Sequence, residues 1–319
     1  MAEPIDQPIK NVHIRYYAAA CRKLGIPYAL DLRTRILRLT TKSGKNVFCY
    51  KASTPLNLQS AVSMSKDKRE VHRLLEPLKL PIPVQLRIRD VETELLPFFD
   101  QYQKIVVKPA DSHGGKGVTV LPVSSELQLA FNRARKESTI VLAEQYVSGQ
   151  NYRLLVLDKK VLAVSLRKPP TIIGDGKTTL GTLFDDFNSE NKANGLPRVP
   201  DSVRTWEIVE KQGFARASIP QLGQNVLLRL TANLSLGGTV LDVTEQCHDV
   251  YKQLAIDATS ALGLRLAGID LIAEDITQPG KPVFVLEANA APGMRIHYKT
   301  ADGAKLDVAT SIISAIYEL

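Results

Sequence analysis

The spacing of apolar residues along the chain switches repeatedly between the period of a helix and that of a strand. Apolar residues three and four positions apart predict helices, whereas short apolar or alternating runs predict strands. The predicted helices are 11–24, 67–78, 125–136, 180–191, 248–262 and 305–318. The predicted strands are 28–40, 46–50, 105–108, 118–121, 140–146, 152–157, 161–167 and 226–230, with two more apolar runs that begin at Gly268 and Val283. This order predicts an α+β protein with mostly antiparallel sheets.

Turn and cap residues divide the chain into parts. Gly25 ends the first predicted helix, Asp67 suits the N-cap of the second, and Pro81 closes the segment that follows. We therefore expect residues 1–90 to form a small N-terminal lobe with its linker. Residues 169–206 form a long excursion from the sheet, and excursions of this length are usually functional or mobile.

A glycine-rich segment, Asp111 to Gly117, joins the predicted strands 105–108 and 118–121. A Walker A loop and a dinucleotide fingerprint both need a strand, a loop and then a helix, so the strand–loop–strand order disfavours both folds. A flexible loop with several free amides can still fold over phosphates from the side. An ordinary hairpin turn is the alternative.

Oxygen-bearing side chains interrupt the two apolar runs near the end of the chain. Asp270 follows apolar Ile269, and Glu287 and Asn289 are two positions apart, so on a strand the latter two share a face. Two carboxylates and an amide oxygen in an apolar sheet are costly unless a cation neutralises them. Such hard ligands in low number suit Mg²⁺, which keeps part of its shell for water and phosphate oxygens. We predict a metal-bound phosphate.

Composition excludes several classes of function. The net charge of +8 comes from dispersed basic residues with few aromatic residues, which argues against a nucleic-acid-binding protein and fits a positive cleft for anionic substrates or a solvated basic surface. The three scattered cysteines predict neither disulfides nor structural zinc. There is no membrane-length apolar run, and residues 1–11 do not resemble a signal peptide, so a cytoplasmic location is expected.

Eight segments carry a resemblance to one family. They are Asp67-Lys68, Val107-Lys108-Pro109, Ser-His-Gly-Gly-Lys-Gly-Val at 112–118, Glu-Gln-Tyr-Val-Ser-Gly at 144–149, Gly-Asp-Gly-Lys at 174–177, Thr-Ala-Asn-Leu-Ser-Leu-Gly-Gly-Thr at 231–239, Gly-Ile-Asp at 268–270 and Glu-Ala-Asn-Ala-Ala-Pro-Gly at 287–293. Through them, the chain from about residue 55 to 319 resembles the ATP-grasp carboxylate–amine ligases, most of all the ATP-grasp modules of cyanophycin synthetase and bifunctional glutathione synthetase. The length leaves no room for the further modules of either protein, so a single-step ligase is favoured.

The resemblance implies ATP held between two α+β lobes, a small lobe at 91–147 with the glycine-rich loop and a large lobe at 148–319, with residues 1–90 as a third. It implies Mg²⁺, with Mn²⁺ as an alternative, bound by Asp270, Glu287 and Asn289. A substrate carboxylate would attack the γ-phosphate, and an amine would capture the acyl phosphate to give an amide, ADP and phosphate.

The resemblance also implies which residues bind the nucleotide. Lys68 and Lys108 match phosphate-contacting lysines, and the alternative for each is a surface lysine that only snorkels to water. The inter-lobe hinge, with Glu144, Gln145 and Val147, would contact the adenine. The glycine loop, with Gly114, Gly115 and Gly117, would cover the phosphates. Asn151 stands where relatives usually place an acidic residue on the ribose, which weakens that assignment.

The resemblance also implies which residues bind the substrate and take part in catalysis. Arg153, Arg167 and Arg229 match arginines that face a carboxylate or acyl phosphate, and pairing with a neighbouring acid is the alternative. Gly238, with Gly237, matches amides that cradle the acyl phosphate, and Asn233 would contact substrate or order that loop. A further residue of the glycine loop, His113, would deprotonate the amine or merely touch phosphate or solvent.

The main hypothesis is an ATP-dependent ligase that joins an amino acid or short-peptide carboxylate to an amine, without nucleic-acid or membrane partners. The alternatives are a glutathione-synthetase-like addition to a γ-glutamyl dipeptide, ligation in a modified-peptide pathway, and a non-catalytic nucleotide-binding partner protein. The family's members are often homodimers. The sequence does not name the two substrates.

Overall fold

The computed structural model describes residues 9–31, 33–111, 116–121, 123–303 and 305–319. The chain divides into two compact units, each with its own buried apolar residues. The first unit comprises residues 1–164, 243–298 and 306–319, and the second comprises 165–242 and 299–305. Three residues expected in the site, His113, Gly114 and Gly115, lie outside the described residues.

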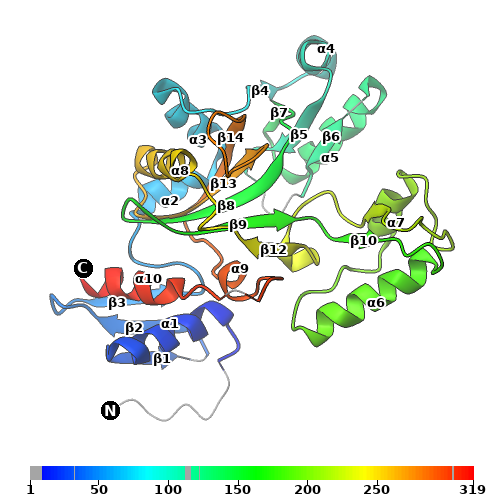
Figure 1. Ribbon diagram of the computed structural model, residues 1–319. Coiled ribbons are helices and arrows are strands. Elements are labelled where there is room, and N and C mark those ends of the chain that lie inside the picture. Colours follow the sequence, from blue (N-terminus) through cyan, green and yellow to red (C-terminus); the bar gives the residue numbers. More distant parts are fainter. Residues whose placement is uncertain (1–8, 32, 112–115, 122, 304) are drawn as a thin grey trace. The chain divides into compact units, whose positions relative to one another are not determined.

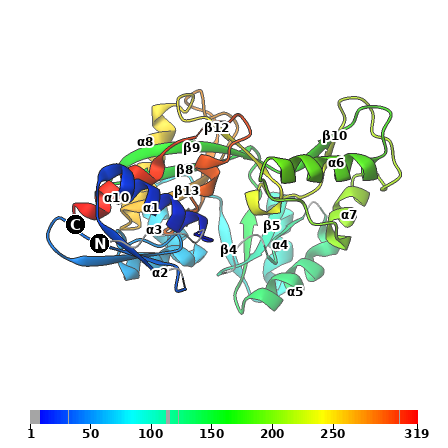
Figure 2. The same ribbon diagram turned by 90° about the horizontal axis from the view of Figure 1, so that it is seen from below.

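The first unit begins with a lobe of two helices and a three-stranded antiparallel sheet of order β1-β2-β3. Its elements are α1 (Val12–Leu24), β1 (Tyr28–Asp31), β2 (Ile36–Thr40), β3 (Asn46–Tyr50) and α10 (Val308–Tyr317). Asn11 caps α1 through its side-chain oxygen, and Gly25 ends the helix at φ 66°. The helices α1 and α10 lie side by side, and their apolar faces share one core with the sheet (Figures 1 and 2).

A second sheet in the same unit has the order β4-β7-β5-β6 and is antiparallel throughout. Its strands are β4 (Gln85–Ile88), β5 (Ile105–Pro109), β6 (Thr119–Leu121) and β7 (Val141–Gln145). The helix α5 (Leu127–Glu137) packs against this sheet, and α4 (Leu96–Tyr102) precedes β5. The helices α2 (Gln59–Lys66) and α3 (Lys68–Leu75) come before β4, and short turns of other helix types lie at Glu76–Leu78, Val91–Leu95 and Ser124–Glu126. Because β5 and β7 are almost fully buried, any charged residue on them must be paired.

A third sheet of the first unit has the order β9-β8-β13-β14. Its elements are β8 (Gln150–Leu157), β9 (Lys160–Lys168), β13 (Leu266–Ala273) and β14 (Val283–Asn289), with the helices α8 (Asp249–Ala261) and α9 (Arg295–Tyr298). The strand β9 crosses from the first unit into the second after Val164. The register of β13 against β14 shifts between Asp270 and Leu271. Such irregularities in a sheet are common next to functional sites.

The side chain of Asn57 ties the start of β13 to the segment after β14. Its oxygen accepts hydrogen bonds from the backbone N–H groups of Arg265 (2.8 Å) and Leu266 (3.0 Å). Its Nδ2 donates to the carbonyls of Leu266 (2.7 Å) and Ala290 (2.9 Å). A single amide therefore satisfies four backbone groups and fixes where the strand that carries Asp270 begins.

The second unit holds the excursion that follows β9. The residues of β9 beyond Val164 pair with β12 (Thr239–Asp242), and β10 (Thr171–Ile173) pairs with β11 (Asn225–Leu227). Its helices are α6 (Leu180–Ala193), α7 (Val203–Glu210) and the 3₁₀ turn η4 (Leu234–Leu236). Phe184, Val199 and Val226 are among its buried core residues.

The predicted α+β class with antiparallel sheets is confirmed, since every strand pair among the described residues is antiparallel. The predicted strand 28–40 is two strands, because the chain turns between them with Arg35 at φ 61°. The strand predicted at 226–230 ends at Leu227. The sequence did not predict α2, α4, α7, β4 or β12. Throughout the residues described, no helix has both the length and the apolar character to cross a membrane.

Candidate active site

The buried lysine Lys108 lies on β5 next to Glu144 on β7, and the two side chains form an ion pair with only 8% of each exposed. The pair is diagonal across the ladder, because Lys108 is opposite Leu142 and Glu144 is opposite Val106. The side-chain amide of Gln85 also donates to Glu144, at 3.1 Å. Lys108 is therefore an interior charge and not a snorkelling surface lysine.

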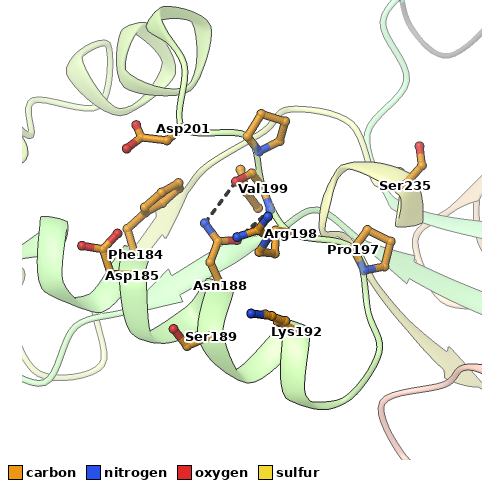
Figure 3. A pocket seen from close by; sticks show the side chains of 11 residues that line it. Phe184, Asp185, Asn188, Ser189, Lys192, Pro197, Arg198, Val199, Asp201 and Ser235 are labelled. Carbon is orange, nitrogen blue, oxygen red and sulfur yellow. Dashed lines mark hydrogen bonds between the residues drawn. The ribbon is translucent and has the colours of Figure 1, made fainter.

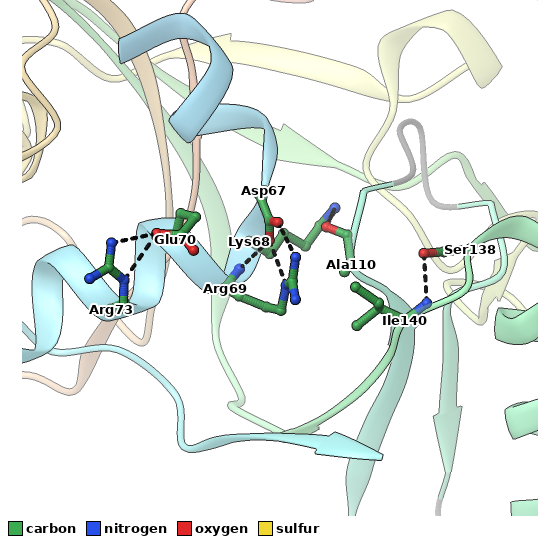
Figure 4. A network of polar contacts seen from close by, with 8 residues as sticks. All are labelled: Asp67, Lys68, Arg69, Glu70, Arg73, Ala110, Ser138 and Ile140. Carbon is green, nitrogen blue, oxygen red and sulfur yellow. Dashed lines mark hydrogen bonds and ion pairs between the residues drawn. The ribbon is translucent and has the colours of Figure 1, made fainter. Parts of the chain in front are cut away.

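Lys68 is the first residue of α3, and Asp67 caps that helix by accepting from the backbone N–H of Arg69 (Figure 4). Its ammonium group donates to the carbonyl of Ala110 at 3.4 Å. Burial lowers the pKa of Lys68, and the charges of Glu287 and Lys108 act on it next, the first raising and the second lowering its pKa. The structure thus brings Lys68 and Lys108, which are 40 positions apart in the sequence, into one electrostatic neighbourhood with Glu287.

Three neighbouring strands place Arg153, Asp270 and Glu287 in one row. Asp270 on β13 is opposite Arg153 on β8 and opposite Glu287 on β14. The guanidinium of Arg153 binds the Asp270 carboxylate in a bidentate pair, Nε to Oδ1 at 2.6 Å and Nη2 to Oδ2 at 2.7 Å. Burial lowers the pKa of Arg153, but the carboxylates of Asp270 and Glu287 outweigh it and raise that pKa. Arg153 thus has the acid-paired arrangement considered from the sequence, and its contact with substrate stays a prediction.

Asn289 lies opposite Gly268, two positions beyond Glu287 along β14. Its Nδ2 is buried and has no hydrogen-bond partner among the residues described. A Cβ at Gly268 would lie 3.1 Å from Pro292 and 3.2 Å from Arg153, so a larger residue there needs these side chains to shift by a few tenths of an ångström. The carboxylate oxygens of Asp270 and Glu287 and the side-chain amide oxygen of Asn289 are ligands that suit a hard divalent cation, since each oxygen keeps lone pairs beyond those that Arg153 uses.

A buried histidine lies close to this row. His297 on α9 is 1% exposed, and burial, followed by the charge of Arg153, lowers its pKa to about 3. No role for His297 was predicted from the sequence. Within the described part of the chain, no three His, Cys, Asp or Glu residues group as a metal site, so the predicted set depends on the amide of Asn289.

The predicted hinge runs from the end of β7 into β8. The backbone N–H of Gln145 donates to Val84 at 2.9 Å, and that of Tyr146 donates to Lys104 at 3.2 Å. Val147 follows, and Asn151 lies on β8 opposite Ile272. The side chain of Glu144 is engaged with Lys108, so contacts of this segment with adenine stay a prediction. Gly117 has φ 69°, which favours glycine.

In the second unit, Arg229 is a buried cation with 6% of its surface exposed. Its Nε has no partner among the described residues, and its Nη2 reaches only the Ser202 hydroxyl at 3.4 Å. Burial, and then the charge of Arg204, lowers the pKa of Arg229. A buried guanidinium without a carboxylate is costly, and an anionic ligand would relieve that cost. The neighbouring Arg204 was not predicted.

The segment around η4 is an ordered turn. Asn233 accepts at its side-chain oxygen from the N–H (3.0 Å) and hydroxyl (2.8 Å) of Ser235, and its carbonyl accepts from Gly238 at 3.1 Å. A Cβ at Gly238 would lie 2.9 Å from that carbonyl. Asn233 therefore orders the loop, one of the two roles expected for it. Arg167 lies on β9 opposite Val240 of β12, also within the second unit.

Comparison with known proteins shows which family the chain belongs to. An ATP-grasp domain model matches residues 65–293. The chain belongs to the ATP-grasp family. It is 32% identical over 266 residues to the cyanophycin synthetase of Trichormus variabilis, which covers 80% of this chain and 29% of that protein. It is 35% identical over 224 residues to the glutathione biosynthesis bifunctional protein of Enterococcus faecalis, covering 66% of this chain and 30% of that protein.

Among solved structures, a bifunctional glutathione synthetase from Pasteurella multocida matches with a TM-score of 0.68 at 25% identity, over 96% of this chain and 44% of the other. This ATP-grasp chain therefore spans less than a third of the two curated relatives and less than half of the solved structure. The resemblance on which the nucleotide-site residues were named is confirmed at the level of the family and the fold.

Proposed function

We propose that this ATP-grasp protein is an ATP-dependent ligase that joins the carboxylate of an amino acid or short peptide to an amine through an acyl phosphate. One observation carries the proposal most directly. Lys68, Lys108, Asp270, Glu287 and Arg153 form one cluster of buried or half-buried charges on four sheet strands and a helix N-terminus. A cluster this polar in an apolar interior is the arrangement expected of a site for a polyphosphate and a cation.

The first-unit residues would bind the nucleotide. Lys68 and Lys108 would hold phosphate oxygens of ATP, and the backbone around Gln145 and Val147 would contact the adenine. Asp270, Glu287 and Asn289 would hold Mg²⁺, or Mn²⁺ as an alternative, which when bound neutralises part of the phosphate charge. Bringing a carboxylate against a polyphosphate joins anions, so positive charge aimed at the transferring group is the main catalytic requirement.

The second-unit residues would act on the acyl group. A substrate carboxylate oxygen attacks the γ-phosphorus and ADP leaves, which gives an acyl phosphate. Arg229 and Arg167 would bind that anion, and the amides of Gly237 and Gly238 would cradle it. An uncharged amine then attacks the acyl carbon, phosphate leaves, and the amine loses a proton. His113 remains the candidate base for that proton.

A glutathione-synthetase-like reaction is the second candidate. The likeness to the Pasteurella multocida glutathione synthetase extends over 96% of this chain, including the N-terminal lobe. In this reading the acyl substrate is a γ-glutamyl dipeptide and the amine is a further amino acid. We also propose residues 1–90, 91–147 and 148–319 as the functional lobes.

The test is a screen of paired amino acids and dipeptides with ATP and Mg²⁺, measuring ADP release and then the mass of the product. The proposal expects release that needs both substrates and a product lighter by one water than their sum. Asp270→Asn should abolish release, whereas Asp257→Asn, an exposed carboxylate on α8, should leave it unchanged. The absence of substrate-dependent release for every pair would refute the ligase.

A further inference from the structure

The second unit contains a cavity of about 760 Å³, and none of the predicted site residues that the structure describes lines it. It lies between α6, the segment 197–201 and Ser235 of η4 (Figure 3). Its charged lining residues are Asp185, Lys192, Arg198 and Asp201. The sequence indicated only that the excursion 169–206 would matter and gave no hint of a cavity.

The charged residues that line this cavity differ in how strongly they are paired. Asp201 accepts from Trp206 Nε1 at 2.6 Å and from Arg216 at 3.0 Å, and these contacts lower its pKa. Among the residues that the structure describes, Asp185 has one long ion pair, to Arg216 at 3.9 Å. Within the described part of the chain, neither Lys192 nor Arg198 has an acidic partner. The cavity thus offers two cations and one weakly engaged carboxylate.

The two kinds of charge are separated across the cavity. Figure 3 shows Asp185 and Asp201 on one side and Lys192, Arg198 and Ser235 on the other. A cavity with a negative and a positive end is complementary to a zwitterion, whose carboxylate and ammonium lie a few ångströms apart. A purely anionic ligand would meet Asp185 unfavourably.

The segment that carries Arg198 is held in place before any ligand binds. The side chain of Asn188 on α6 donates to the carbonyl of Val199 at 3.0 Å and accepts from its N–H at 2.8 Å. Asn191 donates to the carbonyl of Pro197 at 3.2 Å. Both neighbours of Arg198 are therefore anchored to α6, which lowers the ordering cost of binding.

We propose that this cavity binds the α-amino acid head group of one substrate, with Lys192 and Arg198 on its carboxylate and Asp185 on its ammonium. The proposal rests on the ligase function and deepens it, because it requires a substrate with a free, non-reacting zwitterionic head. Ser235 links the cavity to the loop of Gly238, which is proposed to cradle the acyl phosphate, since Asn233 binds Ser235 and also accepts from Gly238.

Binding is testable without turnover, because the only tryptophan of the chain reports on this cavity. The ring of Trp206 lies 5.3 Å from that of Phe184, and its Nε1 donates to Asp201; both partners line the cavity. Tryptophan emission of the full chain would be titrated with each of the twenty L-amino acids, without ATP or metal. We expect a saturable change with at least one. Its amide and its N-acetyl derivative should each bind about tenfold more weakly or worse, since each loses one charge-assisted contact.

One double variant and a control identify the site. Lys192→Ala with Arg198→Ala should raise the dissociation constant about tenfold or more, whereas Lys177→Ala, an exposed lysine outside the cavity, should not. No saturable change with any amino acid, or equal binding by the double variant, would overturn the proposal. If ADP release is found but the double variant keeps the wild-type KM, the proposal of amino-acid binding in the cavity is wrong and the ligase function is retained. If amino-acid binding is found without any ADP release, the ligase function is wrong and the binding proposal is retained.

Discussion

Replacing Lys108 with methionine tests whether the buried pair on β5 and β7 serves folding, catalysis or both. Lys108→Met leaves Glu144 with 8% of its side chain exposed and, within the described part of the chain, the Gln85 amide as its remaining side-chain partner. Removing one partner of a buried ion pair costs about 3–5 kcal/mol. Because the Gln85 hydrogen bond remains, we expect the lower end, a loss of about 3 kcal/mol in the free energy of unfolding.

The measurement is amide hydrogen exchange in peptides that cover β5 and β7, across a urea series. Tryptophan fluorescence would report on the wrong unit, because Trp206 lies in the second one. The double variant Lys108→Met with Glu144→Gln removes both charges and should recover about 2 kcal/mol of the loss. Lys136→Met, at an exposed position of α5, should change stability by less than about 0.5 kcal/mol.

Activity separates the two roles. If Lys108 binds phosphate, the double variant is stable and yet releases ADP at a rate lower by about a hundredfold, because the transferring group has lost a buried cation. A stable double variant with the wild-type rate and the wild-type KM for ATP would show that the pair is structural. A loss below about 1 kcal/mol in Lys108→Met would refute the energetic argument itself.

Three further predictions concern other residues. The pKa of His297 is lowered to about 3 in the folded protein, so on acidification the histidine of the unfolded chain is protonated first. The contribution of His297 to the free energy of unfolding is therefore present above pH 6.5 and falls by about 2 kcal/mol at pH 5. Urea unfolding at pH 5 and above pH 6.5 should show this loss, and it should vanish in His297→Gln. Arg229→Leu should leave the free energy of unfolding unchanged or raise it by about 1 kcal/mol, while the rate of ADP release falls about a hundredfold. A destabilised variant would contradict the interpretation of Arg229 as an unpaired buried charge. Asn57→Ala should destabilise the first unit by about 2–3 kcal/mol, measured by circular dichroism, against no change for exposed Gln59→Ala.

Local signals in the sequence were enough to find the elements that carry the candidate site. The Asp67 cap, the glycine at 25 and the apolar runs around Asp270 and Glu287 act over a few residues, and the structure has them at the predicted places. The helix α7 was missed because prolines and charges before it hide its short apolar face.

Contacts between distant segments could not be predicted, since they depend on strand register. The bidentate pair joins Arg153 and Asp270 across 117 positions, and it exists only because β8 and β13 align at those residues. Asn57 reaches residues more than 200 positions away. The orphaned Nε of Arg229 is equally invisible in sequence, because an arginine on a strand is more often paired.

The packing of α1 against α10 has a consequence for synthesis on the ribosome. Lys23 at the end of the first helix bonds to Asp307, 284 positions later, and Ile14 and Tyr17 share a core with Ile312 and Ile316. Until that later stretch has emerged, the nascent chain holds an amphipathic helix and a three-stranded sheet with their apolar surfaces uncovered. We therefore expect the start of this protein to be among its last parts to reach the native state.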